Sequence, residues 1–78
     1  MNTHRIVIYT LPDCQACKAT RRTLDKYGLA YESINLNDRP DLADQLRQQG
    51  FTQAPIIISG EQVWSGYRPD LIRSLIAS

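Results

Sequence analysis

The chain has 78 residues, enough for one small domain, and we expect residues 1–78 to form that domain around a single small core. Nine Lys or Arg residues against eight Asp or Glu residues leave a formal net charge of +1, too little for the basic field that holds nucleic acid. The apolar run at residues 6–9 is too short for a signal peptide or a membrane span, so we expect a cytoplasmic protein without a nucleic-acid or membrane partner.

The first half of the chain has the pattern of a strand, a helix and a second strand. Residues 6–9 are β-branched and aromatic, which favours a strand buried on both faces. Residues 14–27 change to helical spacing, and Gly28 is a typical residue to end that helix. Residues 31–36 alternate as a second strand does, so we expect the two strands to be parallel, with a right-handed crossover through the helix.

The second half contains a helix, a hairpin and a last helix. A predicted turn at residues 37–40 leads into a short, mostly polar helix that ends at Gly50. Strands at 55–59 and 62–65 flank a two-residue turn that begins with glycine, which is typical of a hairpin. The last helix begins at Pro69. The order β-α-β-α-β-β-α predicts an α/β fold with a four-stranded mixed sheet flanked by three helices.

The two cysteines, Cys14 and Cys17, stand at the junction of the first strand and the first helix. Unpaired N–H groups in the first turn of a helix stabilise a thiolate, the species that attacks disulfides. A disulfide between residues so close in the chain restricts the unfolded state little and is a poor structural staple. We therefore predict a redox-active dithiol in which Cys14, nearer the terminus and more exposed, attacks and Cys17 resolves the mixed disulfide. A CxxC at this junction is typical of the thioredoxin-like fold.

Other interpretations of the cysteine pair stay open. A structural zinc site usually has four ligands, and only His4 is a plausible third, so a metal site within one chain would be incomplete. A zinc or iron–sulfur bridge between two chains, a structural thiol pair and a non-catalytic redox sensor are the alternatives. The dithiol needs no bound cofactor, so we expect neither cofactor nor metal, and a monomer.

Pro55 follows Ala54 at the start of the third predicted strand, where a proline removes a ladder hydrogen-bond donor. In thioredoxin-like domains the proline at this point is cis and faces the CxxC. This resemblance implies that the backbone of Ala54 binds an extended substrate segment and aligns its disulfide with Cys14. An ordinary trans proline that opens a strand is the alternative.

Over nearly its whole length the chain resembles the NrdH-redoxins, small glutaredoxin-like proteins. The resemblance rests on three segments, namely Tyr9-Thr10 before the CxxC, Gln49-Gly50-Phe51 leading to Ala54-Pro55, and above all Trp64-Ser65-Gly66-Tyr67-Arg68-Pro69-Asp70. It implies an electron carrier that is reduced by thioredoxin reductase and that donates electrons to class Ib ribonucleotide reductase. The substrate would then be a redox-active cysteine pair of that enzyme.

Two features differ from glutaredoxins that bind glutathione. Those proteins tend to have Lys or Arg three residues before the first cysteine, where this chain has Leu11. They also have a Gly-Gly pair followed closely by Asp, whereas here the pair is Ser65-Gly66 and Asp70 comes later. Loss of two such contacts lowers affinity by orders of magnitude, so we expect weak or no glutathione binding. Leu11 also departs from the basic residue often seen in NrdH-redoxins.

The segment from Trp64 to Asp70 has two predicted roles. Gly66 and Tyr67 are expected nearest the CxxC surface, where they join Ala54 and Pro55 as substrate-binding residues. We assign Trp64, Arg68 and Asp70 to a structural loop, with Trp64 packing and Arg68 holding the loop through its guanidinium hydrogen bonds.

Two further functions compete with this interpretation. The first is a general glutaredoxin that depends on glutathione. The second is a redox-sensing interaction protein on the arsenate-reductase-like fold, but that group needs extra helical sequence between its second and third strands, for which this chain has no room.

Overall fold

The computed structural model describes residues 5–60 and 62–77, so His4 and the second turn residue, Glu61, lie outside the described part. Four strands, three α-helices and one short 3-10 helix form within those residues. In chain order they are β1 (Ile6–Thr10), α1 (Gln15–Lys26), β2 (Glu32–Asn35), η1 (Leu36–Asp38), α2 (Pro40–Gln48), β3 (Ile56–Ser59), β4 (Gln62–Ser65) and α3 (Pro69–Ala77). The predicted order of strands and α-helices is confirmed.

Several element boundaries differ from the sequence prediction by one residue, and two of these differences have a clear local cause. The first helix begins at Gln15, because Cys14 has an extended conformation (φ −103°, ψ 110°) and serves as its N-cap. The second strand ends at Asn35, whose side-chain oxygen accepts a hydrogen bond from the backbone N–H of Asn37 at 2.8 Å. That cap starts η1 where the sequence predicted only a turn, because an asparagine side chain competes with the strand for backbone donors.

The strands form one mixed sheet in the order β2-β1-β3-β4. Strand β1 is parallel to β2 and antiparallel to β3, and β3 is antiparallel to β4. Ser59 pairs with Gln62 across the hairpin, so the predicted two-residue connection is confirmed, and Gly60 has φ +58°. The parallel β1-α1-β2 crossover is confirmed as well.

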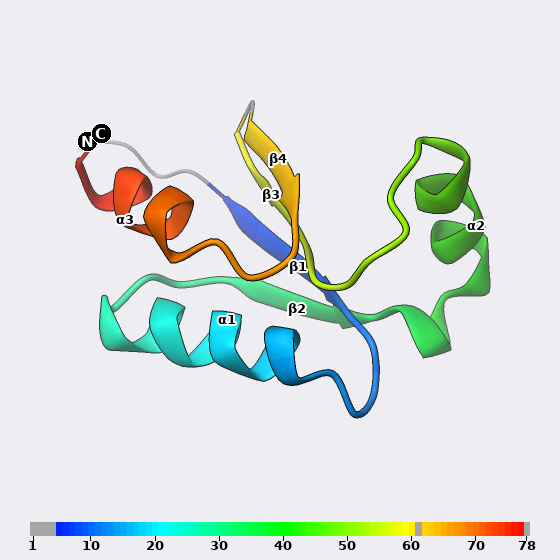
Figure 1. Ribbon diagram of the computed structural model, residues 1–78, viewed down its shortest axis with the longest axis horizontal. Coiled ribbons are helices and arrows are strands. Elements are labelled where there is room, and N and C mark those ends of the chain that lie inside the picture. Colours follow the sequence, from blue (N-terminus) through cyan, green and yellow to red (C-terminus); the bar gives the residue numbers. More distant parts are fainter. Residues whose placement is uncertain (1–4, 61, 78) are drawn as a thin grey trace.

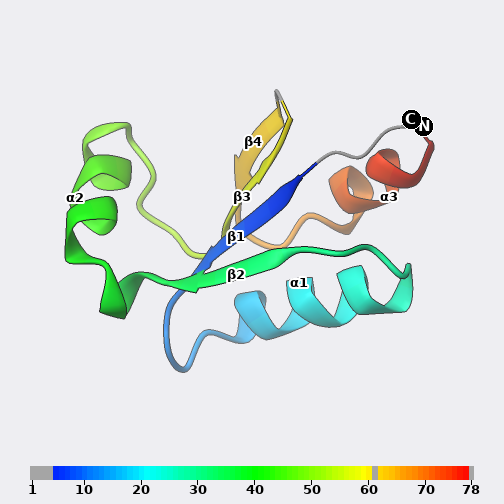
Figure 2. The same cartoon turned by 180° about the vertical axis from the view of Figure 1, so that it is seen from behind.

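Helices cover both faces of the sheet. Helices α1 and α3 lie on one face and α2 on the other, as both ribbon views show (Figures 1 and 2). Alternate residues of β1 and β3 face opposite layers, as the pleat requires. The larger apolar cluster, on the α1 and α3 side, comprises Ile6, Ile8, Leu24, Ile57, Trp64 and Ile72. The smaller cluster, on the α2 side, comprises Leu36, Leu46 and Ile56, with Tyr9 and Phe51 packed against them.

This topology brings two distant segments together. Strand β1 runs into the CxxC, and β3 pairs antiparallel with β1 so that Tyr9 lies opposite Ile56. The start of β3, which follows Pro55, therefore lies beside the end of β1, where the cysteines follow. No helix in the described part of the chain is long and apolar enough to cross a membrane.

Candidate active site

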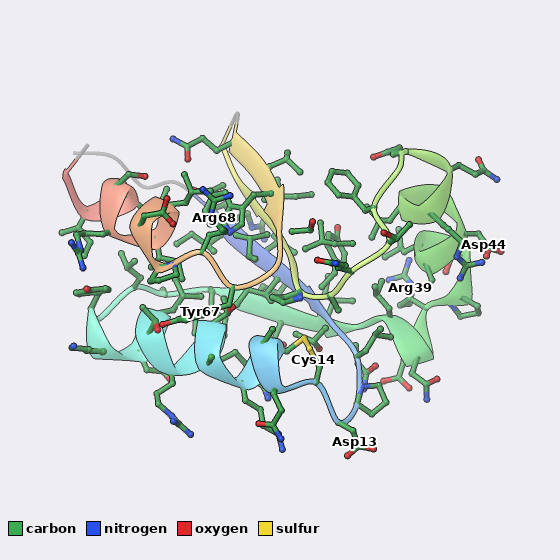
Figure 3. The ribbon with its side chains drawn as sticks, in the orientation of Figure 1. Asp13, Cys14, Arg39, Asp44, Tyr67 and Arg68 are labelled. Carbon is green, nitrogen blue, oxygen red and sulfur yellow. A yellow bond between two sulfur atoms is a disulfide. The ribbon has the colours of Figure 1, made fainter. Side chains whose placement is uncertain are left out.

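Cys14 and Cys17 are joined by a disulfide at the start of α1, with their Cα atoms 5.2 Å apart (Figure 3). Cys17 is only 1% exposed, whereas Cys14 is half-buried and reaches the surface. The first cysteine is thus the more accessible of the two, as the sequence predicted. An incoming sulfur can approach Cys14 but not Cys17.

The helix terminus supplies a hydrogen-bond donor to the accessible sulfur. The backbone N–H of Cys17 donates to Sγ of Cys14 at 3.0 Å, because Cys14 is the N-cap of α1. In the reduced protein the same donor, with the positive end of the helix dipole, stabilises negative charge on this sulfur. The local geometry therefore favours a thiolate at Cys14.

Asp13 has a backbone conformation that few residues with a side chain adopt. Its φ is +57°, in the left-handed region, and its carboxylate points away from the disulfide into solvent (Figure 3). Asp and Asn tolerate this region better than other residues that carry a Cβ. The turn at Asp13 redirects the chain from β1 into α1 and so presents Cys14.

The Ala54–Pro55 peptide bond is cis, as predicted from the thioredoxin-like pattern. Sγ of Cys14 lies 3.8 Å from the carbonyl oxygen of Ala54, although the two residues are 40 positions apart. Pro55 is buried and precedes the first residue of β3, so its missing N–H takes no hydrogen bond away from the ladder. The backbone of Ala54 therefore lies directly beside the accessible sulfur.

The segment after β4 is tied to both sides of this site. Gly66 has φ +86°, and its N–H donates to the carbonyl oxygen of Pro55 at 2.8 Å. The hydroxyl of Tyr67 lies 2.9 Å from Oγ1 of Thr23 on α1. Since Thr23 donates its own hydroxyl hydrogen to the carbonyl of Ala19 at 2.9 Å, Tyr67 is the donor in the first bond. The sequence contained no local signal for the Thr23–Tyr67 contact.

The three residues assigned to a structural loop have different positions. Trp64 lies within β4, 7% exposed, because its ring packs in the larger apolar cluster, and Asp70 lies in the first turn of α3. Only Arg68 belongs to a loop. Its guanidinium binds Asp70 through two bonds, Nε to Oδ1 at 3.2 Å and Nη2 to Oδ2 at 3.1 Å. Hydrogen bonding to Arg68 lowers the pKa of the Asp70 carboxyl.

A cavity of about 150 Å³ lies beside the active site and was not foreseen from the sequence. Its lining includes Leu11 and also Ala54, whose carbonyl oxygen lies beside the accessible sulfur. The remaining lining comes from α2, η1, the start of β3 and the segment between α2 and β3. The lining residues lie far apart in the chain, so no local sequence pattern predicts the cavity. Within residues 5–60 and 62–77, no group of three or more His, Cys, Asp or Glu side chains is arranged to hold a metal ion.

Comparison with known proteins agrees with this geometry. The sequence profile of the glutaredoxin family matches residues 6–64. The glutaredoxin-like protein NrdH of Escherichia coli strain K12 is 48% identical over 71 residues, which is 91% of this chain and 88% of the relative. The NrdH of Lactococcus lactis strain IL1403 is 27% identical over 70 residues, 90% of this chain and 97% of the relative.

Solved structures give the same result. NrdH-redoxin from Escherichia coli superposes with a TM-score of 0.88 at 48% identity, covering 91% of this chain and 93% of that one. A glutaredoxin from Archaeoglobus fulgidus shares the fold, with a TM-score of 0.81 at 22% identity, covering 99% and 90% of the two chains.

Fold, cysteine pair and comparisons together define a thiol-disulfide oxidoreductase with the thioredoxin fold. The chain belongs to the glutaredoxin family and, within it, to the NrdH-redoxins.

Proposed function

We propose that this protein carries electrons from thioredoxin reductase to class Ib ribonucleotide reductase. The observation that carries the proposal is the Cys14–Cys17 disulfide at the surface end of α1, with Sγ of Cys14 facing the carbonyl of Ala54. Membership in the NrdH-redoxins supports the choice of both partners. The solved Escherichia coli relative is described as having a thioredoxin-like activity profile, which supports thioredoxin reductase as the electron source.

The proposed reaction transfers two electrons in two sulfur exchanges. The thiolate of Cys14 attacks one sulfur of the substrate disulfide, and the other substrate sulfur leaves as a thiolate that takes up a proton. The thiolate of Cys17 then attacks Sγ of Cys14, and the second substrate sulfur leaves in the same way. The products are a substrate dithiol and the intramolecular disulfide present in this structure. Thioredoxin reductase, a flavoenzyme, then supplies two electrons and two protons that restore the dithiol. The protein itself therefore needs no cofactor.

Four residues are proposed to bind the substrate segment. Ala54 and Pro55 lie beside the attacking sulfur, so an extended segment bonded to Cys14 passes over them. Gly66 is linked to Pro55 by a hydrogen bond, and Tyr67 is exposed beside α1. These contacts support a rigid, preformed surface for a protein substrate.

Glutathione binding is proposed to be weak or absent. The carboxylate of Asp70 is engaged by both arms of the Arg68 guanidinium, so it is not a free partner for a glutathione ammonium group. Leu11 stands where glutaredoxins that bind glutathione tend to have a cation. Both observations favour a reductase over glutathione as the electron source.

A general glutaredoxin is the rival function, and a coupled assay separates the two. We expect one disulfide substrate to be reduced readily with NADPH and thioredoxin reductase, and at least tenfold more slowly with glutathione and glutathione reductase. The Cys14→Ser variant is the blank in both assays. A clear preference for glutathione would reject the proposal.

We further propose that residues 1–78 work as one monomeric domain in the cytoplasm. The dithiol chemistry supports this location, because cytosolic reductants keep thiols reduced, so that disulfides there are usually transient and catalytic. Size-exclusion chromatography of the reduced protein, with metal analysis of the same sample, tests the oligomeric state. A coloured or zinc-containing dimer would favour a metal bridge between two chains.

A further inference from the structure

The cavity near Cys14 is lined mainly by apolar side chains, and one of its lining residues, Ala54, also lies against the reacting sulfur. Its apolar part consists of Leu11, Leu36, Ala43, Leu46, Phe51, Ala54 and Ile56. The carbonyl oxygen of Ala54 lies 3.8 Å from Sγ of Cys14, and Leu11 precedes Cys14 by three positions in the chain. A group bonded to Cys14 therefore lies next to a residue that lines this cavity.

Leu11 is the unusual part of that lining. Its side chain is 45% exposed, although it is large and apolar. Single exposed apolar residues are common and need no explanation. Leu11, however, both lines the cavity and stays exposed, so it enlarges the apolar surface that a bound segment can cover.

The polar residues that line the cavity do not favour a charged ligand. They are Arg47, Thr52 and Gln53. The guanidinium of Arg47 already binds Asp44 at 3.2 Å, so its charge is largely compensated. An apolar group is therefore the best chemical match for the cavity.

We propose that this cavity binds an apolar side chain of the oxidised substrate polypeptide, two positions from the cysteine that becomes bonded to Cys14, and that Leu11 makes the protein select such substrates. The inference rests on the proposed function, because it assumes a polypeptide disulfide as substrate.

The spacing and the size both fit this occupant. In an extended segment, residues two positions apart point to the same side and lie about 7 Å apart along the chain. A side chain two positions from the reacting cysteine thus points to the same protein surface as the cysteine and reaches past Ala54 into the cavity. A cavity of about 150 Å³ holds a molecule the size of benzene, so a Leu or Phe side chain fits.

Two disulfide-linked peptide dimers test the inference. Each half is an extended peptide with one cysteine, and the two dimers differ only in having Leu or Ser at both positions two residues from that cysteine. The fully reduced protein converts each dimer to two thiol peptides while its own dithiol becomes the Cys14–Cys17 disulfide. Burial of a Leu side chain predicts that kcat/KM for the Leu dimer exceeds that for the Ser dimer by about tenfold or more.

Variants then assign the selection to Leu11. We expect Leu11→Ser to reduce the ratio of the two kcat/KM values to about threefold or less. Ile76→Ser is the matched control, because Ile76 is 47% exposed on α3 and does not line the cavity, so this variant should keep the wild-type ratio. Circular dichroism of both variants checks that the fold is kept.

The outcomes separate this inference from the proposed function. Equal rates with the two dimers overturn the inference but leave a protein-disulfide reductase. A wild-type ratio in Leu11→Ser also overturns it, and if the variant then has a raised KM for thioredoxin reductase, the apolar surface serves the reductase instead. Failure to reduce either dimer removes the proposed function, and the inference with it.

Discussion

At the scale of single residues, the reactivity of this site follows from the conformations of Asp13 and Cys14. The left-handed backbone at Asp13 turns the chain so that Cys14, not Gln15, caps α1. As the cap, Cys14 receives the N–H of Cys17 on its sulfur, and Cys17 is carried one turn into the protein, where it is buried. The two cysteines therefore differ in access and in hydrogen bonding, and this difference supports their different proposed roles.

Substitution of each cysteine tests these roles. The Cys17→Ser variant should accumulate a covalent complex with a disulfide substrate, because no second thiolate is left to release it. The Cys14→Ser variant should form no such complex, because Cys17 is buried. Mass spectrometry under non-reducing conditions measures both species. Trapping by Cys14→Ser alone would mean that the roles are reversed.

At the scale of elements, the segment from β4 to α3 connects the active site with the rest of the fold. Gly66 binds Pro55, Tyr67 binds Thr23 on α1, and the backbone carbonyl of Arg68 accepts hydrogen bonds from the first turn of α3. These bonds fix the distance between α1, the cis-proline and α3. The segment is thus held to Pro55 and to α1 by hydrogen bonds and leads directly into α3.

The Arg68–Asp70 pair should make the stability of α3 depend on pH. Hydrogen bonding and charge from Arg68 lower the pKa of Asp70 in the folded protein. Because the pKa of Asp70 is lower in the folded protein, the pair stabilises the fold at pH values above the ordinary Asp pKa of about 3.9. This contribution is lost as the pH falls through the folded-state pKa. Both side chains are exposed, so the effect is small and weakens in salt.

Urea unfolding of Asp70→Asn measures this contribution. The midpoint of the variant should lie below that of the wild type at pH 7, and the two should converge by about pH 2. In an Arg68→Gln background the same substitution should show a smaller pH dependence, because Arg68 is the largest cause of the lowered pKa of Asp70 and only its backbone hydrogen bonds are left. A difference between the wild type and the Asp70→Asn variant that grows toward low pH would contradict the assignment.

At the scale of the whole molecule, two apolar layers hold the helices on a sheet of four short strands. The larger layer attaches α1 and α3 through Leu24 and Ile72, and the smaller layer attaches α2 through Leu46. A protein of this size has little stability to spare, because the net free energy of unfolding is a small difference between large terms. Single contacts in the larger layer therefore matter for the whole fold.

Two isoleucines of α3 provide a matched test of that layer. Ile72 is 0% exposed, so Ile72→Ala should lower the free energy of unfolding by about 2–5 kcal/mol. Ile76 is 47% exposed, so Ile76→Ala should change it by about 0.5 kcal/mol or less. Urea unfolding of the oxidised proteins gives both values. Equal losses at the two positions would mean that α3 is not anchored through Ile72.

How far the sequence predicts this structure depends on how local each signal is. Short sequence patterns predict the strand at 6–9, the helix after the CxxC and the hairpin around Gly60, and all three are present. The short helix η1 was missed because the side chain of Asn35 decides its start. The Thr23–Tyr67 bond joins residues 44 positions apart, and no periodicity predicts such a contact.

The chemistry of this protein is determined by its sequence alone. Two cysteines at a strand-to-helix junction specify a dithiol whose first sulfur caps a helix, because local backbone geometry suffices to create that environment. What faces that sulfur depends on the tertiary structure, and the sequence indicated it only through the resemblance to thioredoxin-like domains. The antiparallel pairing of β1 with β3 brings Ala54 to Cys14 across 40 residues, and packing of α2 on the sheet opens the apolar cavity that Leu11 extends. Local patterns specify reactivity, whereas contacts between distant segments specify what surrounds the reactive sulfur.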